Sequence, residues 1–203
     1  MNFRKTYCEF IGENFNFKAL YEKEGDSYSK GCAMIFFNFP DQQGLHDLID
    51  PAHLYTEEGD RSYGLENEAH ITLLYGLNKE VTKDEVFDAL KGFTVTEIKL
   101  KNVSAFKNEK FDVLKWDVEA PVLFDMNEEL IKLPHENDFP NYHPHATIAY
   151  LKPVIADHYI KEMLALEYIV QPTHIVYSTA GGEKFQHDIA NMPIKSSGNN
   201  TII

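Results

Sequence analysis

The sequence has few cysteines and no long apolar run, and both shortages limit what the protein can be. Its two cysteines, Cys8 and Cys32, form no CxxC pair, which excludes a disulfide framework and a structural zinc site. No apolar run approaches the ~20 residues that cross a bilayer. Residues 1–10 carry charges and lack the apolar stretch of a signal peptide. We therefore expect a cytoplasmic protein without a membrane partner.

Basic residues are also scarce. The chain of 203 residues has 19 Lys and Arg against 32 Asp and Glu, a formal net charge of −13. A surface this acidic repels a phosphate polymer, so we expect no partner among long DNA or RNA molecules. A small anionic ligand in a locally basic pocket stays possible, because salt limits the reach of distant charges to about 8 Å. The 43% of apolar residues suffices for one large domain or two small lobes.

The chain divides into three parts by composition. Residues 1–30 are aromatic and charged without a clear period, and we interpret them as an N-terminal extension with a helical stretch at 17–24. Residues 31–190 form the expected domain, with an acidic loop at 55–68 whose charged run at 57–60 is a solvated loop or a lid over the cleft. Residues 191–203 form a flexible tail.

Apolar runs, prolines and capping boxes at Thr82 and Asp125 mark the expected elements. They predict strands at 31–40, 70–75, 94–103, 111–118, 145–150, 168–177 and 184–189. They predict helices at 42–49, at 83–91, from 125 to a stop at Pro134, and after Pro153 to about 166.

The chain repeats itself at a spacing of about 75 residues. HITLLYGL at 70–77 and HATIAYLK at 145–152 are each followed by a helix and two strands. The second strand of each pair begins alike, with EKF at 109–111 and again at 183–185. A repeat of this length is longer than any solenoid period. It predicts two similar lobes related by a pseudo-twofold axis.

Each repeated strand offers one polar and one apolar face, because alternate side chains point to opposite sides. In the first strand His70 and Thr72 share a face, and in the second strand His145 and Thr147 share one. The opposite faces are apolar and suit packing. If the two strands face each other across a cleft, two imidazoles and two hydroxyls converge there.

This set of side chains suits the cleavage of a phosphodiester. One imidazole can be neutral while the other is protonated at the same pH. The pair then supplies a general base and a general acid, each worth about 10²–10⁴-fold. The hydroxyls of Thr72 and Thr147 can donate to the non-bridging phosphate oxygens, where charge builds. The chemistry requires no metal or other cofactor, and the base can activate a ribose 2′-OH or a water.

HITL and HATI, as twin H-x-T-hydrophobic strands in a duplicated α+β chain, resemble the 2H phosphoesterase family. That family includes LigT-like RNA 2′-5′ ligases, 2′,3′-cyclic-nucleotide phosphodiesterases and phage anti-CBASS nucleases, and residues 64–77 and 142–151 are most similar to the phage members. The resemblance covers about residues 31–189. It implies a bilobal α+β fold, with two pseudo-twofold-related lobes whose antiparallel sheets surround a central cleft. It also implies metal-independent chemistry with His70 and His145 as the acid–base pair and Thr72 and Thr147 on the phosphate.

Four further residues are candidates for substrate binding, each with a plainer alternative. His143 lies on the face of His145, where it can assist phosphate binding, begin the strand in solvent, or join His145 in ligating a metal. Trp116 can stack on a base or lie in the core. Glu183 and Lys184 follow a glycine turn, where they can bind a base amine and a second phosphate or simply face solvent.

Two tyrosines follow the motifs at matching positions, Tyr75 and Tyr150. They can stack on a base, but by strict alternation along each strand both point away from the histidines, which favours the core.

These observations favour a metal-independent phosphodiesterase that hydrolyses a cyclic di- or oligonucleotide or a short oligoribonucleotide. If a phage encodes it, it acts in the host cytoplasm against nucleotide signalling. An RNA end-processing enzyme that opens 2′,3′-cyclic phosphates or 2′-5′ linkages is the alternative within the class, but it predicts a basic track that the sequence does not contain. A non-catalytic protein that sequesters a cyclic nucleotide is the alternative from another class. Base and linkage specificity, oligomeric state and the identity of the base stay open.

Overall fold

The computed structural model describes residues 30–39, 41–58, 63–136 and 141–189, and the backbone of two short strands before them. The strands are β1 (Lys23–Glu24), β2 (Ser27–Tyr28), β3 (Gly31–Phe37), β4 (His70–Leu77), β5 (Ile98–Lys107), β6 (Asp112–Glu119), β7 (His145–Leu151), β8 (Tyr168–Val170), β9 (Pro172–Ser178) and β10 (Lys184–Asp188). The helices are α3 (Gln42–Asp47), α4 (Lys83–Leu90), α5 (Val122–Leu130) and α6 (Ala156–Glu162), with a 3-10 turn at Pro51–His53. Of the helix predicted at 17–24, only the last two residues are described, and they form β1. The tail at 191–203 lies outside the described residues.

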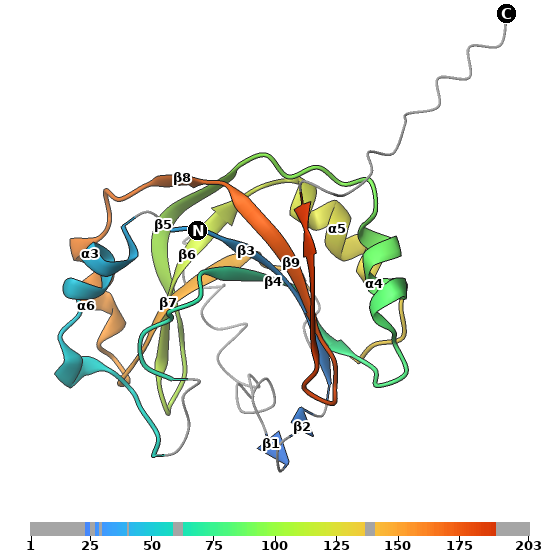
Figure 1. Cartoon of the computed structure of the whole chain (residues 1–203). Coiled ribbons are helices and arrows are strands. Elements are labelled where there is room, and N and C mark those ends of the chain that lie inside the picture. Colours follow the sequence, from blue (N-terminus) through green and yellow to red (C-terminus); the bar gives the residue numbers. More distant parts are fainter. Residues whose placement is uncertain are drawn as a thin grey trace, which may run out of the picture.

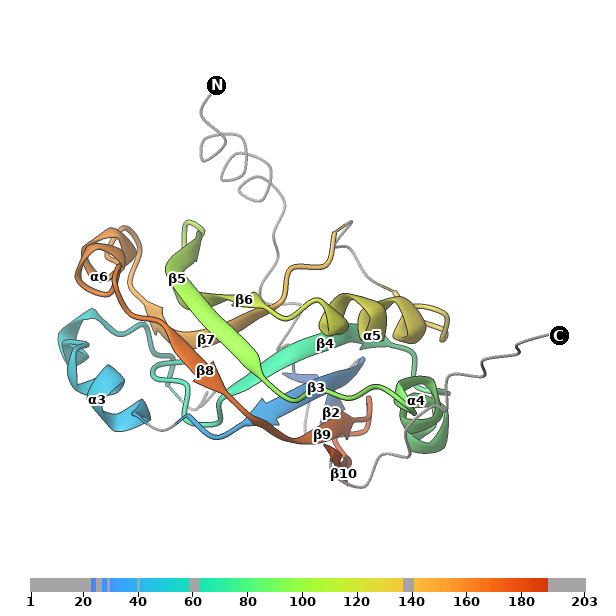
Figure 2. The ribbon, with the colours of Figure 1, turned by 90° about the horizontal axis from the view of Figure 1, so that it is seen from above.

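Eight of the strands form two four-stranded antiparallel sheets, and the molecule has the shape of an arch (Figure 1). The first sheet has the order β10-β9-β3-β4, and the second has the order β7-β6-β5-β8. Their inner edge strands, β4 and β7, pack against each other, as the view from above also shows (Figure 2). Helices α3 and α6 lie at one flank, and α4 and α5 lie at the other. This is the bilobal α+β architecture that the repeated motifs predict.

The two lobes exchange strands. Strands β9 and β10, from the end of the chain, join the first sheet, where β9 pairs with β3 and β10 pairs with β9. Strand β5, which follows the first motif in the sequence, pairs with β6 in the second sheet. The strand predicted at 168–177 is therefore two strands in different sheets, with β8 paired to β5 and β9 paired to β3. The two EKF segments, at 109–111 and 183–185, are not structurally equivalent either. β6 lies between β5 and β7, whereas β10 lies at the outer edge of the first sheet.

Helix α4 begins where the sequence predicts, and α5 does not. The Thr82 side chain accepts from the backbone N–H of Glu85, whose carboxylate accepts from the N–H of Thr82 in return. The capping box predicted at Asp125 does not form. α5 starts a turn earlier, after Pro121, whose fixed φ suits a helix start, and Asp125 lies in its first turn. The helix ends before Pro134, as predicted. β5 begins at Ile98 and not at residue 94.

A single apolar core joins both sheets and all four helices. Strand β3 alternates between buried residues that face this core and half-buried residues on the other side. We call the second side the histidine face of each sheet, because it also carries the motif histidines. It is defined by Cys32, Met34 and Phe36 of β3 in the first sheet and by Val113, Lys115 and Asp117 of β6 in the second.

The acidic stretch 55–68 is attached to β7 at its described ends. The N–H of Tyr55 donates to the carbonyl of Tyr150 at 2.9 Å, and the N–H of Tyr150 donates to the carbonyl of Gly64 at 2.8 Å. Of the charged run at 57–60 only Glu57 and Glu58 are described, so its interpretation as a solvated loop or a lid stays a prediction. Among the described residues, none of the helices has the length and apolar character to cross a membrane.

Candidate active site

His70 and His145 are the first residues of β4 and β7, and their rings are held in the same way. Nδ1 of His70 lies 2.7 Å from the carbonyl oxygen of Glu68, and Nδ1 of His145 lies 2.8 Å from the carbonyl oxygen of His143. Because a carbonyl only accepts, each Nδ1 carries the hydrogen, and each Nε2 keeps a lone pair while the ring is neutral. The two rings therefore present the same nitrogen for proton transfer.

The pKa of His145 is about 4, well below its ordinary value of 6.5. Burial is the largest cause, because it disfavours the charged ring. The hydrogen bond to the carbonyl of His143 raises the pKa, and the positive charges of Lys115, His70 and His143 lower it further. The two motif histidines stand on strands that pack against each other. At neutral pH the ring of His145 is a base.

Thr72 and Thr147 lie two residues further along the same strands, half-buried on the histidine faces. Thr72 is opposite Met34 in β3, and Thr147 is opposite Lys115 in β6. The Thr72 hydroxyl hydrogen-bonds to the thiol of Cys32, whose pKa burial raises to about 12. The structure thus brings the four side chains predicted as catalytic to the inner edges of the two sheets.

Both motif strands contain a β-bulge at matching positions. Leu73 is the extra residue in β4, and Ile148 is the extra residue in β7. An extra residue reverses the alternation of side chains beyond it. Tyr75 and Tyr150 therefore pair with residues of the histidine faces, and the prediction that both point away from the histidines is wrong. Tyr150 is nevertheless only 4% exposed, because it packs in a small aromatic cluster on that face.

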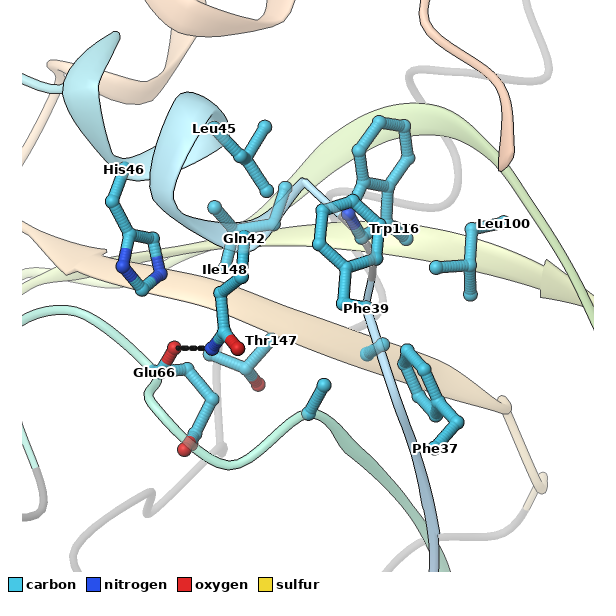
Figure 3. A pocket seen from close by; sticks show the side chains of 12 residues that line it. Phe37, Phe39, Gln42, Leu45, His46, Glu66, Leu100, Trp116, Thr147 and Ile148 are labelled. Atoms are coloured by element: carbon cyan, nitrogen blue, oxygen red, sulfur yellow. Dashed lines mark hydrogen bonds between the residues drawn. The ribbon is translucent and has the colours of Figure 1, made fainter. Parts of the chain in front are cut away.

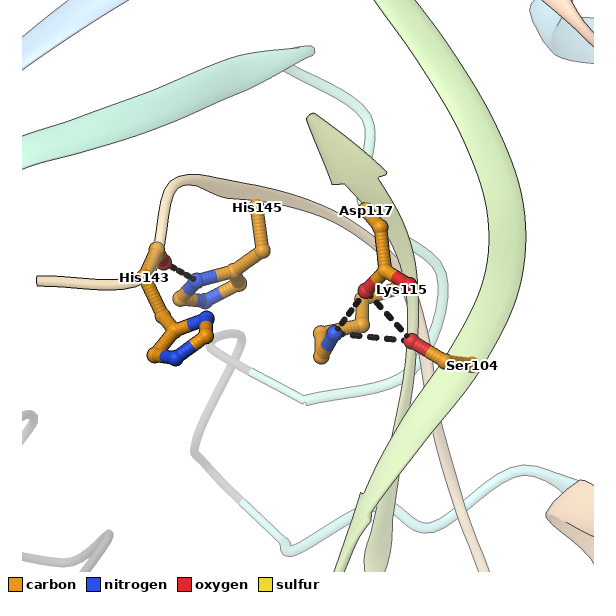
Figure 4. A network of polar contacts seen from close by, with 5 residues as sticks. All are labelled: Ser104, Lys115, Asp117, His143 and His145. Atoms are coloured by element: carbon orange, nitrogen blue, oxygen red, sulfur yellow. Dashed lines mark hydrogen bonds and ion pairs between the residues drawn. The ribbon is translucent and has the colours of Figure 1, made fainter. Parts of the chain in front are cut away.

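A buried lysine that is absent from the predicted site lies beside His145 (Figure 4). Nζ of Lys115 lies 2.6 Å from Oδ1 of Asp117 and 2.8 Å from Oγ of Ser104, which in turn donates to Asp117 at 2.7 Å. The lysine side chain is 8% exposed, and burial lowers its pKa while Asp117 raises it. The sequence signal is the pair Lys115 and Asp117 at alternate positions of the strand FDVLKWDV, whose only other charged residue is Asp112.

In the first sheet the position of Asp117 is taken by an aromatic residue and that of Lys115 by Met34. The ring of Phe36, opposite His70, stacks on that histidine with centroids 5.3 Å apart. On its other side Phe36 stacks on His174 of β9, with centroids 5.0 Å apart and planes at 8°. His174 is also absent from the predicted site, and nothing in the pattern of β9 distinguishes it. The two motif histidines thus have aromatic and charged surroundings, respectively.

Trp116 lies in the core and is 2% exposed. With Phe39 and Leu100 it lines a cavity of about 20 Å³ between α3 and β7, where the Gln42 amide donates to the carbonyl of Glu66 at 2.8 Å (Figure 3). A cavity of this size holds about one water. The prediction that Trp116 contacts substrate is therefore wrong, and its alternative as a core residue is correct.

Glu183 and Lys184 are not brought to the histidines. Both are exposed in the hairpin between β9 and β10, and Lys184 is opposite Ser178, at the end of the first sheet away from His70. β10 is also three strands away from β4, roughly 14 Å by the usual spacing of strands. Their alternative as solvated turn residues fits this position.

His143 is the one further candidate that lies at the site. It is exposed just before β7, and its ring lies beside that of His145 (Figure 4). Burial and the charge of Lys115 lower its pKa, and Asp117 raises it. In the described part of the chain, no group of three or more His, Cys, Asp and Glu side chains is placed to hold a metal ion.

No protein-family model and no curated protein matches the sequence. Among solved structures, Usb1 of Kluyveromyces marxianus matches with a TM-score of 0.50 and 10% identity, over 81% of this chain and 100% of that chain. LigT of E. coli complexed with 3′-AMP matches with a TM-score of 0.46 and 14% identity, over 78% of this chain and 95% of that chain. TT0787 of Thermus thermophilus matches with a TM-score of 0.45 and 16% identity, over the same shares. The chain has the bilobal α+β fold of the 2H phosphoesterases, which confirms the fold predicted from the twin motifs.

Proposed function

We propose that this protein is a phosphodiesterase of the 2H type, in which His70 and His145 transfer protons while Thr72 and Thr147 bind the reacting phosphate. The observation that carries the proposal is the matched hydrogen bond from Nδ1 of each ring to the carbonyl two residues earlier. This bond leaves Nε2 of both rings available, on two strands that pack against each other. Core histidines would have no reason to present the same nitrogen from two matching positions.

The reaction that this arrangement supports is a displacement at phosphorus. One neutral Nε2 accepts the proton of a ribose 2′-OH or a water while that oxygen forms a new bond to phosphorus. The other ring, protonated, donates its proton to the oxygen of the P–O bond that breaks. Each proton transfer contributes about 10²–10⁴-fold. The threonine hydroxyls donate to the non-bridging oxygens, where negative charge increases in the transition state.

For the substrate we propose a cyclic di- or oligoribonucleotide. The net charge of −13 opposes a long polyanion but not a ligand small enough to lie near a few groups. The second histidine face carries the cation of Lys115 beside the strand of Thr147, which favours one or two phosphates locally. An enzyme with this substrate removes nucleotide second messengers, as a phage protein directed against host signalling would.

The test is a substrate panel with product analysis by mass spectrometry, run in EDTA. It contains cyclic di- and trinucleotides, a 2′,3′-cyclic mononucleotide, a 2′-5′-linked dinucleotide and a linear RNA of about 30 nucleotides. His70→Ala and His145→Ala proteins are compared with His158→Ala, which removes an exposed histidine of α6. We expect turnover of the cyclic oligonucleotides, a loss of about 10²–10⁴-fold in each motif variant, and no loss in the control.

Each other outcome has a definite meaning. Turnover of only the mononucleotide or the 2′-5′ linkage would make the protein an RNA end-processing enzyme and remove the proposed substrate. Tight binding of a cyclic nucleotide without products would make it a sequestering protein and remove the catalytic roles. Equal activity of the three variants would remove the two histidines from the mechanism.

A further inference from the structure

The two lobes share a fold and a motif, but they surround their histidines with different groups. Across from His70 lies the aromatic ring of Phe36, and across from His145 lies the carboxylate of Asp117. Opposite Thr72 the first lobe has Met34, whereas opposite Thr147 the second lobe has the buried cation of Lys115. A lysine is almost never buried unless paired, because its charge is costly to desolvate. The second lobe keeps one beside the reacting groups.

We propose that Lys115, held by Asp117 and Ser104, is a positioning residue that adds to the effect of burial in keeping the ring of His145 unprotonated. His145, with its ring neutral, is the proton acceptor and His70 the proton donor. The inference deepens the proposed function and rests on it for the two catalytic roles. The effect of Lys115 on the protonation of His145 does not depend on the proposed function.

Lys115 and His145 are close enough in the fold to contact the same side chain, Phe106. Nζ lies 4.5 Å from the centre of the Phe106 ring, and that ring meets His145 edge to face, with centroids 4.9 Å apart. The cation and the imidazole thus contact the same apolar ring, which limits water there, and a low local dielectric strengthens the interaction of charges. The charge of Lys115 therefore opposes a second positive charge on His145.

The carboxylate that holds Lys115 does not cancel this effect. Asp117 is 46% exposed, so water screens it, whereas the lysine side chain is only 8% exposed. The other titratable groups near His145 are His143 on its own segment and His70 on β4, and both add positive charge when protonated. Lys101 of β5, opposite Asp117, is paired with Glu119. The charges that face His145 thus favour its neutral form, the form that accepts a proton.

The test is an NMR titration of the His145 imidazole in the full chain, in the wild type and in Lys115→Met, Lys115→Arg and Asp117→Asn proteins. Removing the cation by Lys115→Met should raise the pKa of His145 by on the order of one unit. Lys115→Arg should restore the low value, and Asp117→Asn, which leaves the cation without its partner, should not raise it. Lys101→Met, a lysine one strand away and 39% exposed, is the matched control and should leave the titration unchanged.

The same proteins are assayed for kcat/KM between pH 4 and pH 8 on the substrate that the panel identifies. The ratio of wild type to Lys115→Met should increase as the pH falls, to about fivefold at pH 4 for a shift of one unit from a pKa of about 4. A His145 titration that does not move in folded Lys115→Met, or that moves equally in Lys115→Arg, overturns the inference. If Lys115→Met does not fold, Lys115→Gln takes its place, and a His145 titration that does not move in that protein overturns the inference instead. If no substrate is turned over, the proposed function fails while the titration still decides the effect of Lys115.

Discussion

A histidine whose Nδ1 bonds to a main-chain carbonyl has its tautomer set by the backbone. Both motif histidines are of this kind, with the carbonyl two residues earlier in the chain. No side-chain substitution at Glu68 or His143 removes that acceptor, so the orientation of the rings follows from the start of each strand. What differs between the rings at the residue scale is their surroundings, and in the proposed mechanism burial and charge around His145 decide which ring accepts a proton.

The pH dependence expected from the proposed mechanism follows from the burial of His145 and from the charges around it. A general base works only while it is unprotonated, and the pKa of His145 is about 4. We therefore expect kcat/KM to stay near its plateau as the pH falls below 6.5 and to decrease only close to pH 4. The measurement is a pH–rate profile on the substrate that the panel identifies. An acidic limb near 6.5 would show that the base is a histidine with an ordinary pKa.

The threonine hydroxyls are predicted to act in the transition state more than in binding. Thr72→Val and Thr147→Val keep the shape of the side chain and remove the donor to the phosphate. We expect each to lower kcat by about 10²–10³-fold, with a smaller change in KM. Steady-state kinetics measure this, with Thr96→Val as a control at an exposed position outside the motif strands. A rise in KM at unchanged kcat would assign the hydroxyls to ground-state binding only.

At the scale of single elements, the bulges in β4 and β7 turn a tyrosine of each strand toward the histidine face. A bulge leaves the backbone of its extra residue without a partner in the ladder. In β4 the carbonyl of Leu73 accepts instead from Nδ2 of Asn127, on α5, at 2.7 Å. In β7 the carbonyl of Ile148 accepts from the N–H of Glu66 at 3.0 Å. The carbonyl of each extra residue thus accepts a hydrogen bond from a segment outside its own sheet ladder.

Asn127 is the residue whose loss tests this account of β4. Asn127→Ala leaves the buried carbonyl of Leu73 without a donor, which we expect to lower the free energy of unfolding by about 1–3 kcal/mol. Urea unfolding measures the change. Asn67→Ala removes an exposed side chain that also donates to a carbonyl, and it should change stability by less than about 0.5 kcal/mol. Equal effects of the two substitutions would show that the bulge does not depend on α5.

These elements also show where prediction from sequence succeeds and fails. Local signals are sufficient for the motif strands and for α4, because apolar alternation and a capping box act within a few residues. The bulges depend on groups far away in the chain, so strict alternation places Tyr75 and Tyr150 on the wrong face. Lys115 is absent from the predicted site for the same reason, since its partner Ser104 lies on another strand.

At the scale of the whole molecule, catalysis by this pair requires that two sheets hold their inner edges in register. β4 and β7 belong to different sheets, and the strand exchange through β5 and β9 connects those sheets by the chain itself. A side-chain bond also crosses directly between the motifs. The hydroxyl of Tyr142, just before β7, donates to the carbonyl of Thr72 at 3.0 Å. This hydroxyl is buried, and burial raises its pKa.

Tyr142→Phe tests whether that bond aligns the two lobes. The substitution removes one buried hydrogen bond, so we expect a loss of about 1 kcal/mol in stability. The loss in kcat should be larger than this implies, about tenfold, because small misplacements of reacting groups have large effects on rate. Tyr168→Phe, a tyrosine of β8 that packs on Trp116 and not at the motifs, is the matched control and should retain full kcat. A kcat unchanged in Tyr142→Phe would mean that the packing of β4 on β7 and the shared strands align the histidines without this bond.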